Sequence, residues 1–215
     1  MRRRGLLYFA LGLALTMPGL ITPVWAQPAA PTRPPTATRP APPTQADRAA
    51  TAAAERKAAL DQALAALQAA GNEQEAAPLE ARLRQMWLNA GSPAVTLLLG
   101  RGLRELQAGA ALEAEQDFAA ALTLDPEHAE AWHQTAQARF AAGDIPGAIA
   151  AISETLQREP RHFAALQTLS RFAEAREDWK GAYEAWGKAM QIVPKLSGGE
   201  TKLKDLKRRA LGDET

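Results

Sequence analysis

The stretch PEHAEAWHQTAQARFAAGDIPGAIAAISETLQREP, residues 126–160, begins and ends with proline, and Pro194 follows after the same interval of 34 residues. On both sides of Gly143 the stretch is rich in alanine and glutamate, which favour helices. Proline is tolerated in the first turn of a helix but not in its interior. The stretch therefore predicts two helices joined by a turn at Gly143, with each proline marking the start of the next unit.

Alignment of the chain on Pro126, Pro160 and Pro194 shows which other positions repeat. Large residues stand 28 and eight positions before each proline, and small residues stand 24, 12 and five positions before it. In that order the columns are Leu98, Trp132 and Leu166; Phe118, Ile152 and Trp186; Gly102, Ala136 and Ser170; Ala114, Ala148 and Ala182; and Ala121, Thr155 and Ala189. Small residues let two helices approach while large ones fill the adjoining space. The columns predict antiparallel helix pairs.

The turns within the units are marked by glycine in two cases out of three. Gly109 and Gly143 stand 17 positions before their prolines, where a left-handed residue would end the first helix of the pair. In the third unit Glu177 and Asp178 replace the glycine. We expect that turn to be capped differently, with Asp178 as the N-cap of the following helix.

In period, small-residue columns, the aromatic Trp132 and the terminal prolines, the sequence resembles the tetratricopeptide-repeat family over residues 95–194. The resemblance implies an all-α solenoid of antiparallel helix pairs, with units at residues 95–128, 129–162 and 163–196. The tyrosine that this family often has late in the first helix is replaced by Glu105, Arg139 and Ala173. We expect packing at those positions to be shifted or partly exposed to solvent.

Further helices are expected on both sides of the three units. Residues 47–92 predict a helix pair that resembles a degenerate fourth unit, its first helix ending near Gly71 and its second beginning at about Pro78. Residues 200–211 predict a capping helix, because Leu203, Leu206 and Ala210 fall on one face of a helix. A solenoid needs such a polar-faced cap at its end.

The first 26 residues have the pattern of an export signal. Three arginines precede an apolar run, and small residues before Gln27 offer a cleavage site. Retention of this segment as a membrane anchor is the alternative, since the apolar run is about long enough to cross a bilayer. Residues 27–46 contain seven prolines and predict an extended, disordered linker.

Composition narrows the function classes and the compartment. The 25 basic and 24 acidic residues nearly balance, so no electrostatic attraction to nucleic acid or to an anionic membrane is expected. The absence of cysteine excludes disulfides and thiol nucleophiles. Together with the signal it favours a periplasmic protein that folds by burial alone, with no membrane insertion after cleavage.

Catalytic and cofactor-binding motifs are not found. Gly100 and Gly102 form a short G-x-G that no strand precedes, so their expected role is close helix packing. His128 and His133 are five residues apart and point to different faces of a helix, whereas Glu130 and His133 could share one. His162 is expected in a turn between units. We therefore predict no catalytic residue, no cofactor and no metal.

The candidate site is implied by the family resemblance, in which the first helices of successive pairs line a concave groove that receives a peptide or a partner protein. Mapped by repeat phase, the groove residues are Leu99, Leu103 and Leu106; Glu130, His133, Gln134, Gln137 and Phe140; and Gln167, Thr168, Arg171 and Glu174, with Thr96 and Ala164 beside them. The leucines could instead only pack on the preceding helix pair.

The family's clamp for acidic carboxyl-terminal tails needs basic residues and asparagine on this wall. Leu99, Leu103, Ala164 and Thr168 stand at those places, so that specificity is not expected. A protein or peptide partner held in the groove is the leading hypothesis. Self-association through Trp179 or the capping helix is the alternative, and an enzyme with an unrecognised site is a remote one.

Overall fold

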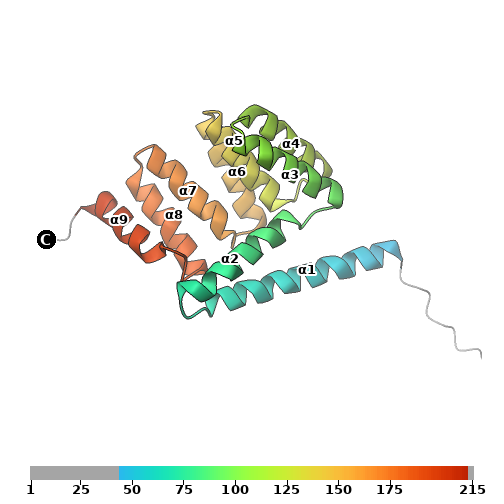
Figure 1. The fold of residues 1–215 in the computed structure, drawn as a ribbon, viewed down its shortest axis with the longest axis horizontal. Helices are drawn as coiled ribbons and strands as arrows, with labels where there is room; N and C mark the ends of the chain where they lie inside the picture. The colour runs from blue at the N-terminus through green and yellow to red at the C-terminus, as the bar shows by residue number, and fades with distance from the viewer. Residues whose placement is uncertain (1–43, 213–215) are drawn as a thin grey trace, which may run out of the picture. The chain divides into compact units, whose positions relative to one another are not determined.

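The computed structural model describes residues 44–212, which contain nine α-helices and no strand (Figure 1). The predicted signal peptide and most of the predicted linker lie outside the described residues. The helices are α1 (Gln45–Gln68), α2 (Glu73–Leu88), α3 (Pro93–Gln107), α4 (Ala111–Leu124), α5 (Ala129–Ala141), α6 (Ile145–Arg158), α7 (Phe163–Ala175), α8 (Trp179–Ile192) and α9 (Gly199–Leu211). The predicted all-α class is confirmed.

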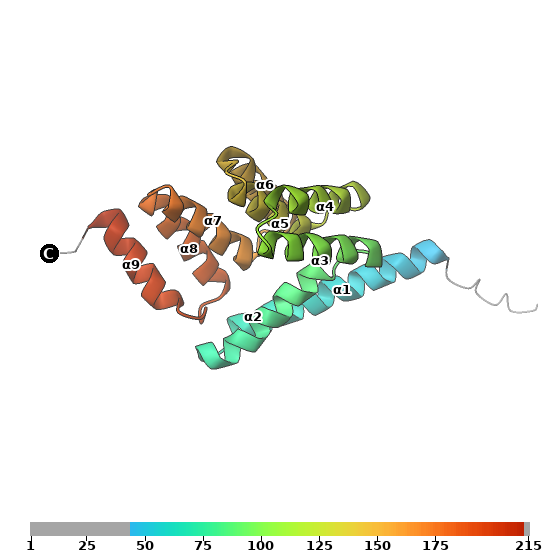
Figure 2. The same ribbon diagram turned by 45° about the horizontal axis from the view of Figure 1, so that its top comes forward.

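Helices α3 to α8 form three antiparallel pairs, one for each predicted unit, and consecutive pairs pack side by side (Figure 2). The repeat columns explain this packing. Phe118 and Ile152, from the large columns, and Ala114, Ala148 and Ala182, from a small one, are almost completely buried. The small-residue column that begins with Gly102 is packed as closely, because a Cβ atom on Gly102 would lie 2.5 Å from a ring carbon of Phe118. The 34-residue period is thus the period of the core.

The turns inside the three units share one backbone geometry. Gly109 and Gly143 have φ angles of 84° and 87°, as predicted for left-handed residues. Glu177 at the equivalent place also has a positive φ, of 58°, and no other non-glycine residue within residues 44–212 does. The expectation of a different turn was therefore wrong in shape, although Asp178 does cap α8 by accepting a hydrogen bond from the amide of Gly181 at 2.9 Å.

The N-terminal helix pair exists, but its boundaries differ from the prediction. Helix α1 begins at Gln45, inside the predicted linker, because Thr44 and Asp47 form a capping box around the first turn. Helix α2 begins at Glu73 rather than at Pro78, because Asn72 caps it by accepting a hydrogen bond from the amide of Glu75. Pro78 lies inside α2, just beyond its first turn.

This hairpin, α1 and α2, does not simply continue the stack as a preceding unit. Helix α2 packs against α5 and α7, on the face that the first helices of the units form (Figure 1). Trp87 of α2 stacks on His162 with ring centroids 4.0 Å apart and contacts Phe163. Leu83 and Trp87 join a hydrophobic cluster that also contains residues of α7, α8 and α9. The hairpin therefore covers part of the inner face of the repeats through α2.

Polar contacts join the same hairpin to the segment between α8 and α9. Glu80 accepts a hydrogen bond from the amide of Ser197 at 3.3 Å, and Glu73 accepts one from the amide of Gly198 at 3.2 Å. Helix α9 packs on α8 as the predicted cap, with Leu206 completely buried. Within residues 44–212, every helix is too short or too polar to traverse a lipid bilayer.

Candidate functional site

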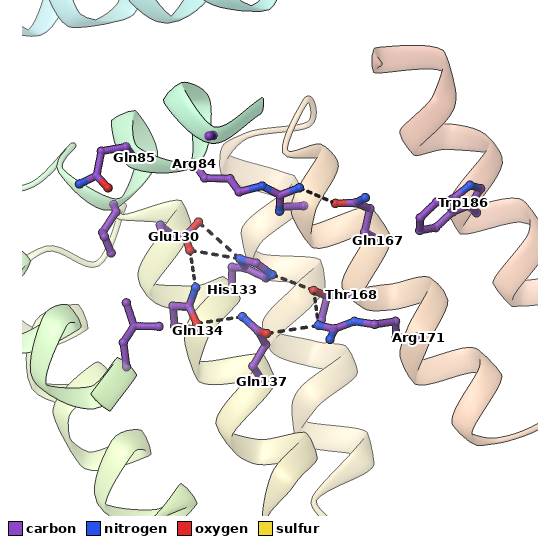
Figure 3. A pocket seen from close by; sticks show the side chains of 14 residues that line it. Arg84, Gln85, Glu130, His133, Gln134, Gln137, Gln167, Thr168, Arg171 and Trp186 are labelled. Atoms are coloured by element: carbon purple, nitrogen blue, oxygen red, sulfur yellow. Dashed lines mark hydrogen bonds and ion pairs between the residues drawn. The ribbon is translucent and has the colours of Figure 1, made fainter. Parts of the chain in front are cut away.

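A pocket of about 610 Å³ opens between α2 and the first helices of the three units (Figure 3). Helix α2 contributes one wall, α5 and α7 form the floor, and α3 and α8 close the two ends. The lining residues are Ala81, Arg84, Gln85, Leu88, Leu103, Glu130, His133, Gln134, Gln137, Ala164, Gln167, Thr168, Arg171 and Trp186. We call this space the inner pocket.

Most of the residues predicted for the groove do line the inner pocket. They are Leu103, Glu130, His133, Gln134, Gln137, Gln167, Thr168 and Arg171, together with Ala164. This agreement follows from repeat phase, because residues 34 positions apart occupy equivalent places on successive first helices. The structure thus brings together side chains of the second and third units at one surface.

Four predicted groove residues lie elsewhere. Leu99 is completely buried in the core of the first unit, and Leu106 packs against the same core. The packing alternative was right that these leucines are core residues, but it had placed them on the preceding helix pair. Phe140 stacks on Phe172 with ring centroids 4.1 Å apart, between the second and third units. Glu174 forms an ion pair with Lys202 of α9. These four residues hold helices together instead of lining the pocket. Their position in the repeat places them on the inner face, but neighbouring helices cover them there.

The floor of the inner pocket is an ordered polar network centred on Glu130, which is 7% exposed. Its carboxylate lies 2.8 Å from Nε2 of His162 and 3.3 Å from Nδ1 of His133, and it accepts a hydrogen bond from the side-chain amide of Gln134. On the other side of its ring, His133 Nε2 lies 2.9 Å from the hydroxyl of Thr168. Three donors therefore surround one buried carboxylate.

The electrostatics of this network keep Glu130 ionised. Burial alone would raise its pKa, but the hydrogen bonds that His133 and His162 make to the charged carboxylate outweigh burial and hold the pKa well below its ordinary range. An ionised carboxylate can only accept hydrogen bonds, so Nδ1 of His133 carries a proton. His133 Nε2 can then accept from Thr168, whose oxygen in turn accepts from Arg171 at 3.2 Å.

His162 has a second task that fixes its tautomer. Its Nδ1 accepts a hydrogen bond from the amide of Ala165 at 3.1 Å and thereby caps α7, just as His128 caps α5. Burial lowers the pKa of His162 and, in the same way, that of His128, so both are neutral at pH 7. With Nδ1 accepting, the proton of His162 sits on Nε2, where it points at Glu130.

Glu130, His133 and His162 are close enough to suggest a metal site, since one potential ligand atom from each lies within 4.8 Å of the others. A metal on Nε2 of His162 would require that nitrogen to lose its proton to Nδ1. Nδ1 would then face the amide of Ala165 donor to donor, and the cap of α7 would be lost. The arrangement therefore fits a hydrogen-bonded network better than a metal centre.

The contributions of α2 and of His162 were not expected from the sequence. Nothing local to residues 81–88 reveals that Arg84 reaches Gln167 of the third unit or that Gln85 lines the inner pocket, because those contacts are tertiary. His162 carried a usable signal, since His128 stands 34 residues before it at the same repeat phase. A capping residue at the start of one unit lies beside the first turn of the preceding unit's first helix, where Glu130 stands.

Trp179, proposed as a surface for self-association, is half-buried within its own chain. The guanidinium carbon of Arg209 lies 4.6 Å from the centroid of its ring. A cation over the ring face is a favourable arrangement in itself. Trp179 is thus already engaged by the capping helix.

Comparison with known proteins identifies the repeats. A family model described as "Tetratricopeptide repeat" matches residues 105–171. A TPR repeat-containing protein of Rhizobium etli is 25% identical over 144 residues, which are 66% of this chain and 69% of that protein. Both comparisons agree with the resemblance expected from the proline period.

Solved structures with a similar fold include the Sgt2 TPR domain from Aspergillus fumigatus and the first TPR domain of Spaghetti (RPAP3) bound to the HSP90 peptide SRMEEVD. The Sgt2 domain is 22% identical with a TM-score of 0.51, and the match covers 55% of this chain and 80% of that one. The Spaghetti domain is 14% identical with a TM-score of 0.50, and the match covers 55% and 94%. At such identities the likeness concerns the fold.

Proposed function

Because this chain is a tetratricopeptide-repeat protein over residues 105–171, we propose that it is a non-catalytic interaction protein that holds a peptide or a segment of a partner protein in the inner pocket. The observation that carries the proposal is the inner pocket itself, about 610 Å³ in volume and lined by side chains of three units and of α2. The lining combines apolar side chains, which supply contact area, with polar groups fixed by hydrogen bonds, which can orient a ligand, as binding sites do. The peptide bound to the Spaghetti domain gives the same fold a precedent for peptide binding.

Site-specific photo-cross-linking tests this function. A photoreactive amino acid replaces the exposed Gln85 on the wall of the inner pocket, and in a control variant it replaces Leu124, which is 59% exposed on α4 and does not line the pocket. In cells that produce the protein, we expect a discrete adduct from position 85 and not from position 124. Equal labelling at both positions, or none, would contradict a partner in the inner pocket.

The compartment is a second part of the proposal. The signal-like residues 1–26 and the absence of cysteine support export to a periplasm, where the protein would serve in a cell-envelope complex. Mass spectrometry of the protein isolated from producing cells tests this. A mature chain that begins at Gln27 in the periplasmic fraction supports it, whereas an intact N-terminus in the cytoplasm would refute it.

A further inference from the structure

Two guanidinium groups line the inner pocket, one on the wall formed by α2 and one on α7 in the floor. Arg84 of α2 donates to the side-chain oxygen of Gln167 at 3.1 Å, and Arg171 of α7 donates to that of Gln137 at 3.2 Å (Figure 3). Arg84 also donates to one carboxylate oxygen of Glu80 at 3.4 Å, which is long for a hydrogen bond. The other oxygen of Glu80 accepts from the amide of Ser197. For Arg171, no carboxylate partner is found among the described residues.

Two arginines elsewhere in the repeats have closer carboxylate partners. Arg101 forms an ion pair with Asp117, and Arg139 lies 2.7 Å from Glu115. Arg171 differs, because its acceptors are the neutral oxygens of Gln137 and Thr168, which orient it without neutralising its charge. Arg84 shares one terminal nitrogen between Gln167 and the carboxylate of Glu80, and its remaining N–H groups face no acceptor among the described residues. A guanidinium held by neutral acceptors keeps free N–H donors for an incoming anion.

The acidic residue of the inner pocket does not neutralise these arginines. Glu130 lies in the floor and accepts from His133, His162 and Gln134, so its lone pairs are directed into the protein. A ligand therefore meets the N–H groups of arginine and glutamine rather than a free carboxylate. The chemistry of the centre of the pocket selects an anion.

Apolar side chains lie at both ends of the pocket, on either side of the arginines. Leu88 and Leu103 pack with the core of the first unit at one end. Trp186 belongs to the cluster of α7, α8 and α9 at the other end (Figure 3). A ligand with its charged group at the centre would therefore contact apolar surface on both sides of that group. An internal acidic residue can use both surfaces, because the chain continues on both sides of it, whereas a terminal carboxylate has residues on one side only.

We propose that the inner pocket binds an internal segment of a partner protein in which one aspartate or glutamate side chain is flanked on both sides by apolar residues. The inference rests on the proposed function and names the ligand chemistry of the same site. The arginines stand outside the positions of the family's acidic-tail clamp, which here hold Leu99, Leu103, Ala164 and Thr168. The wall made by α2 limits the ligand, because a pocket of about 610 Å³ accommodates a few side chains and not a whole helix.

Pools of short peptides test this proposal on the full mature chain. Each pentapeptide is acetylated and amidated, carries random apolar residues around its centre, and has glutamate, glutamine or lysine at the central position. A fourth pool keeps central glutamine but has a free carboxyl terminus. Immobilised protein is incubated with each pool, and the retained peptide is quantified by mass spectrometry.

We expect the glutamate pool to be retained about tenfold better than the glutamine pool, as one charge-assisted hydrogen-bonded contact implies. Arg84→Gln and Arg171→Gln should each abolish this preference. Arg82→Gln is the matched control, because Arg82 is exposed on the same helix as Arg84 but does not line the inner pocket. Thermal melting of all three variants separates lost binding from lost folding, and Arg171→Gln should melt at the wild-type temperature because Arg171 has only neutral acceptors among the described residues.

Equal retention of the glutamate and glutamine pools would overturn the anion preference and leave the proposed function standing. Better retention of the free-carboxyl pool than of the glutamate pool would overturn the internal position. If no pool is retained while cross-linking at position 85 still yields an adduct, the ligand chemistry is wrong and the pocket function is not. Absence of both signals would refute both.

Discussion

Alanine substitutions at the two glycines of α3 provide the sharpest test of the repeat packing. Gly100 and Gly102 are two residues apart in one helix, yet their surroundings differ. A Cβ atom on Gly102 would lie 2.5 Å and 2.9 Å from ring carbons of Phe118, which is completely buried and cannot move aside cheaply. A Cβ atom on Gly100 would meet only the end of the Arg104 side chain, at 3.7 Å.

The magnitude follows from two opposing effects. Replacing glycine by alanine inside a helix raises the free energy of unfolding by about 0.8–1 kcal/mol, and this gain is common to both variants. Overpacking a filled core costs about 1–3 kcal/mol, and this cost falls on Gly102→Ala alone. Gly100→Ala should therefore stabilise the protein, Gly102→Ala should leave it equal or up to about 2 kcal/mol less stable, and the difference between them measures the overlap with Phe118.

Urea unfolding followed by circular dichroism measures both free energies, and thermal melting provides a second readout at about 2–4 °C per kcal/mol for a chain of this size. A third variant, Gly102→Ala with Phe118→Leu, should recover part of the loss if the ring is the obstacle. Equal stabilisation by Gly100→Ala and Gly102→Ala would refute the close approach of α3 and α4 on which the repeat columns depend.

Three further predictions concern the turns and the buried network. Glu177→Gly should stabilise the protein by about 1 kcal/mol, because glycine adopts a φ of 58° without strain, whereas Gly143→Ala at 87° should destabilise it by a similar amount in the same melting assay. Lowering the pH from about 7.5 to about 5.5 should lower the melting temperature, because the pKa of His162 is depressed and the unfolded chain binds the proton that the folded chain excludes; His162→Gln should reduce this slope. The depressed pKa of folded Glu130 stabilises the protein fully only above pH 4.5, the ordinary pKa of glutamate. Below that pH the unfolded chain binds a proton at Glu130 and the folded chain does not, so the free energy of unfolding should fall further. Zinc should not raise the melting temperature, and a rise that His133→Gln removes would show that the tautomer assignment is wrong.

Individual residues show which placements the repeat pattern of the sequence predicted correctly. Ala148 and Phe118 could be placed in the core from the sequence, because each recurs in a column whose burial repeats with the period of the units. Gln137 and Arg171 could be placed on the inner face for the same reason. Leu99 was misplaced, because phase gives the side of a helix on which a residue lies but not what covers it.

The turn at Glu177 shows the converse error. Glycine is the usual residue for a left-handed conformation, so its replacement suggested a different turn. The helices on both sides of Glu177 still close the same pair, and their packing holds this residue at a φ of 58°. Tertiary contacts can outweigh a local cost of about 1–2 kcal/mol.

By itself, the sequence determined the helix pairs and their order, because helix propensity, capping and a 34-residue period act between near neighbours along the chain or between one unit and the next. Only the tertiary structure decided where the α1 and α2 hairpin lies, since it turns back onto α5 and α7 through contacts such as Trp87 on His162, 75 residues apart in the sequence. No period relates residues 73–88 to the third unit, and burial of an apolar face is not directional, so the sequence does not specify which surface covers it. That placement converts an open face of repeats into a pocket with one arginine on the α2 wall and another in the floor.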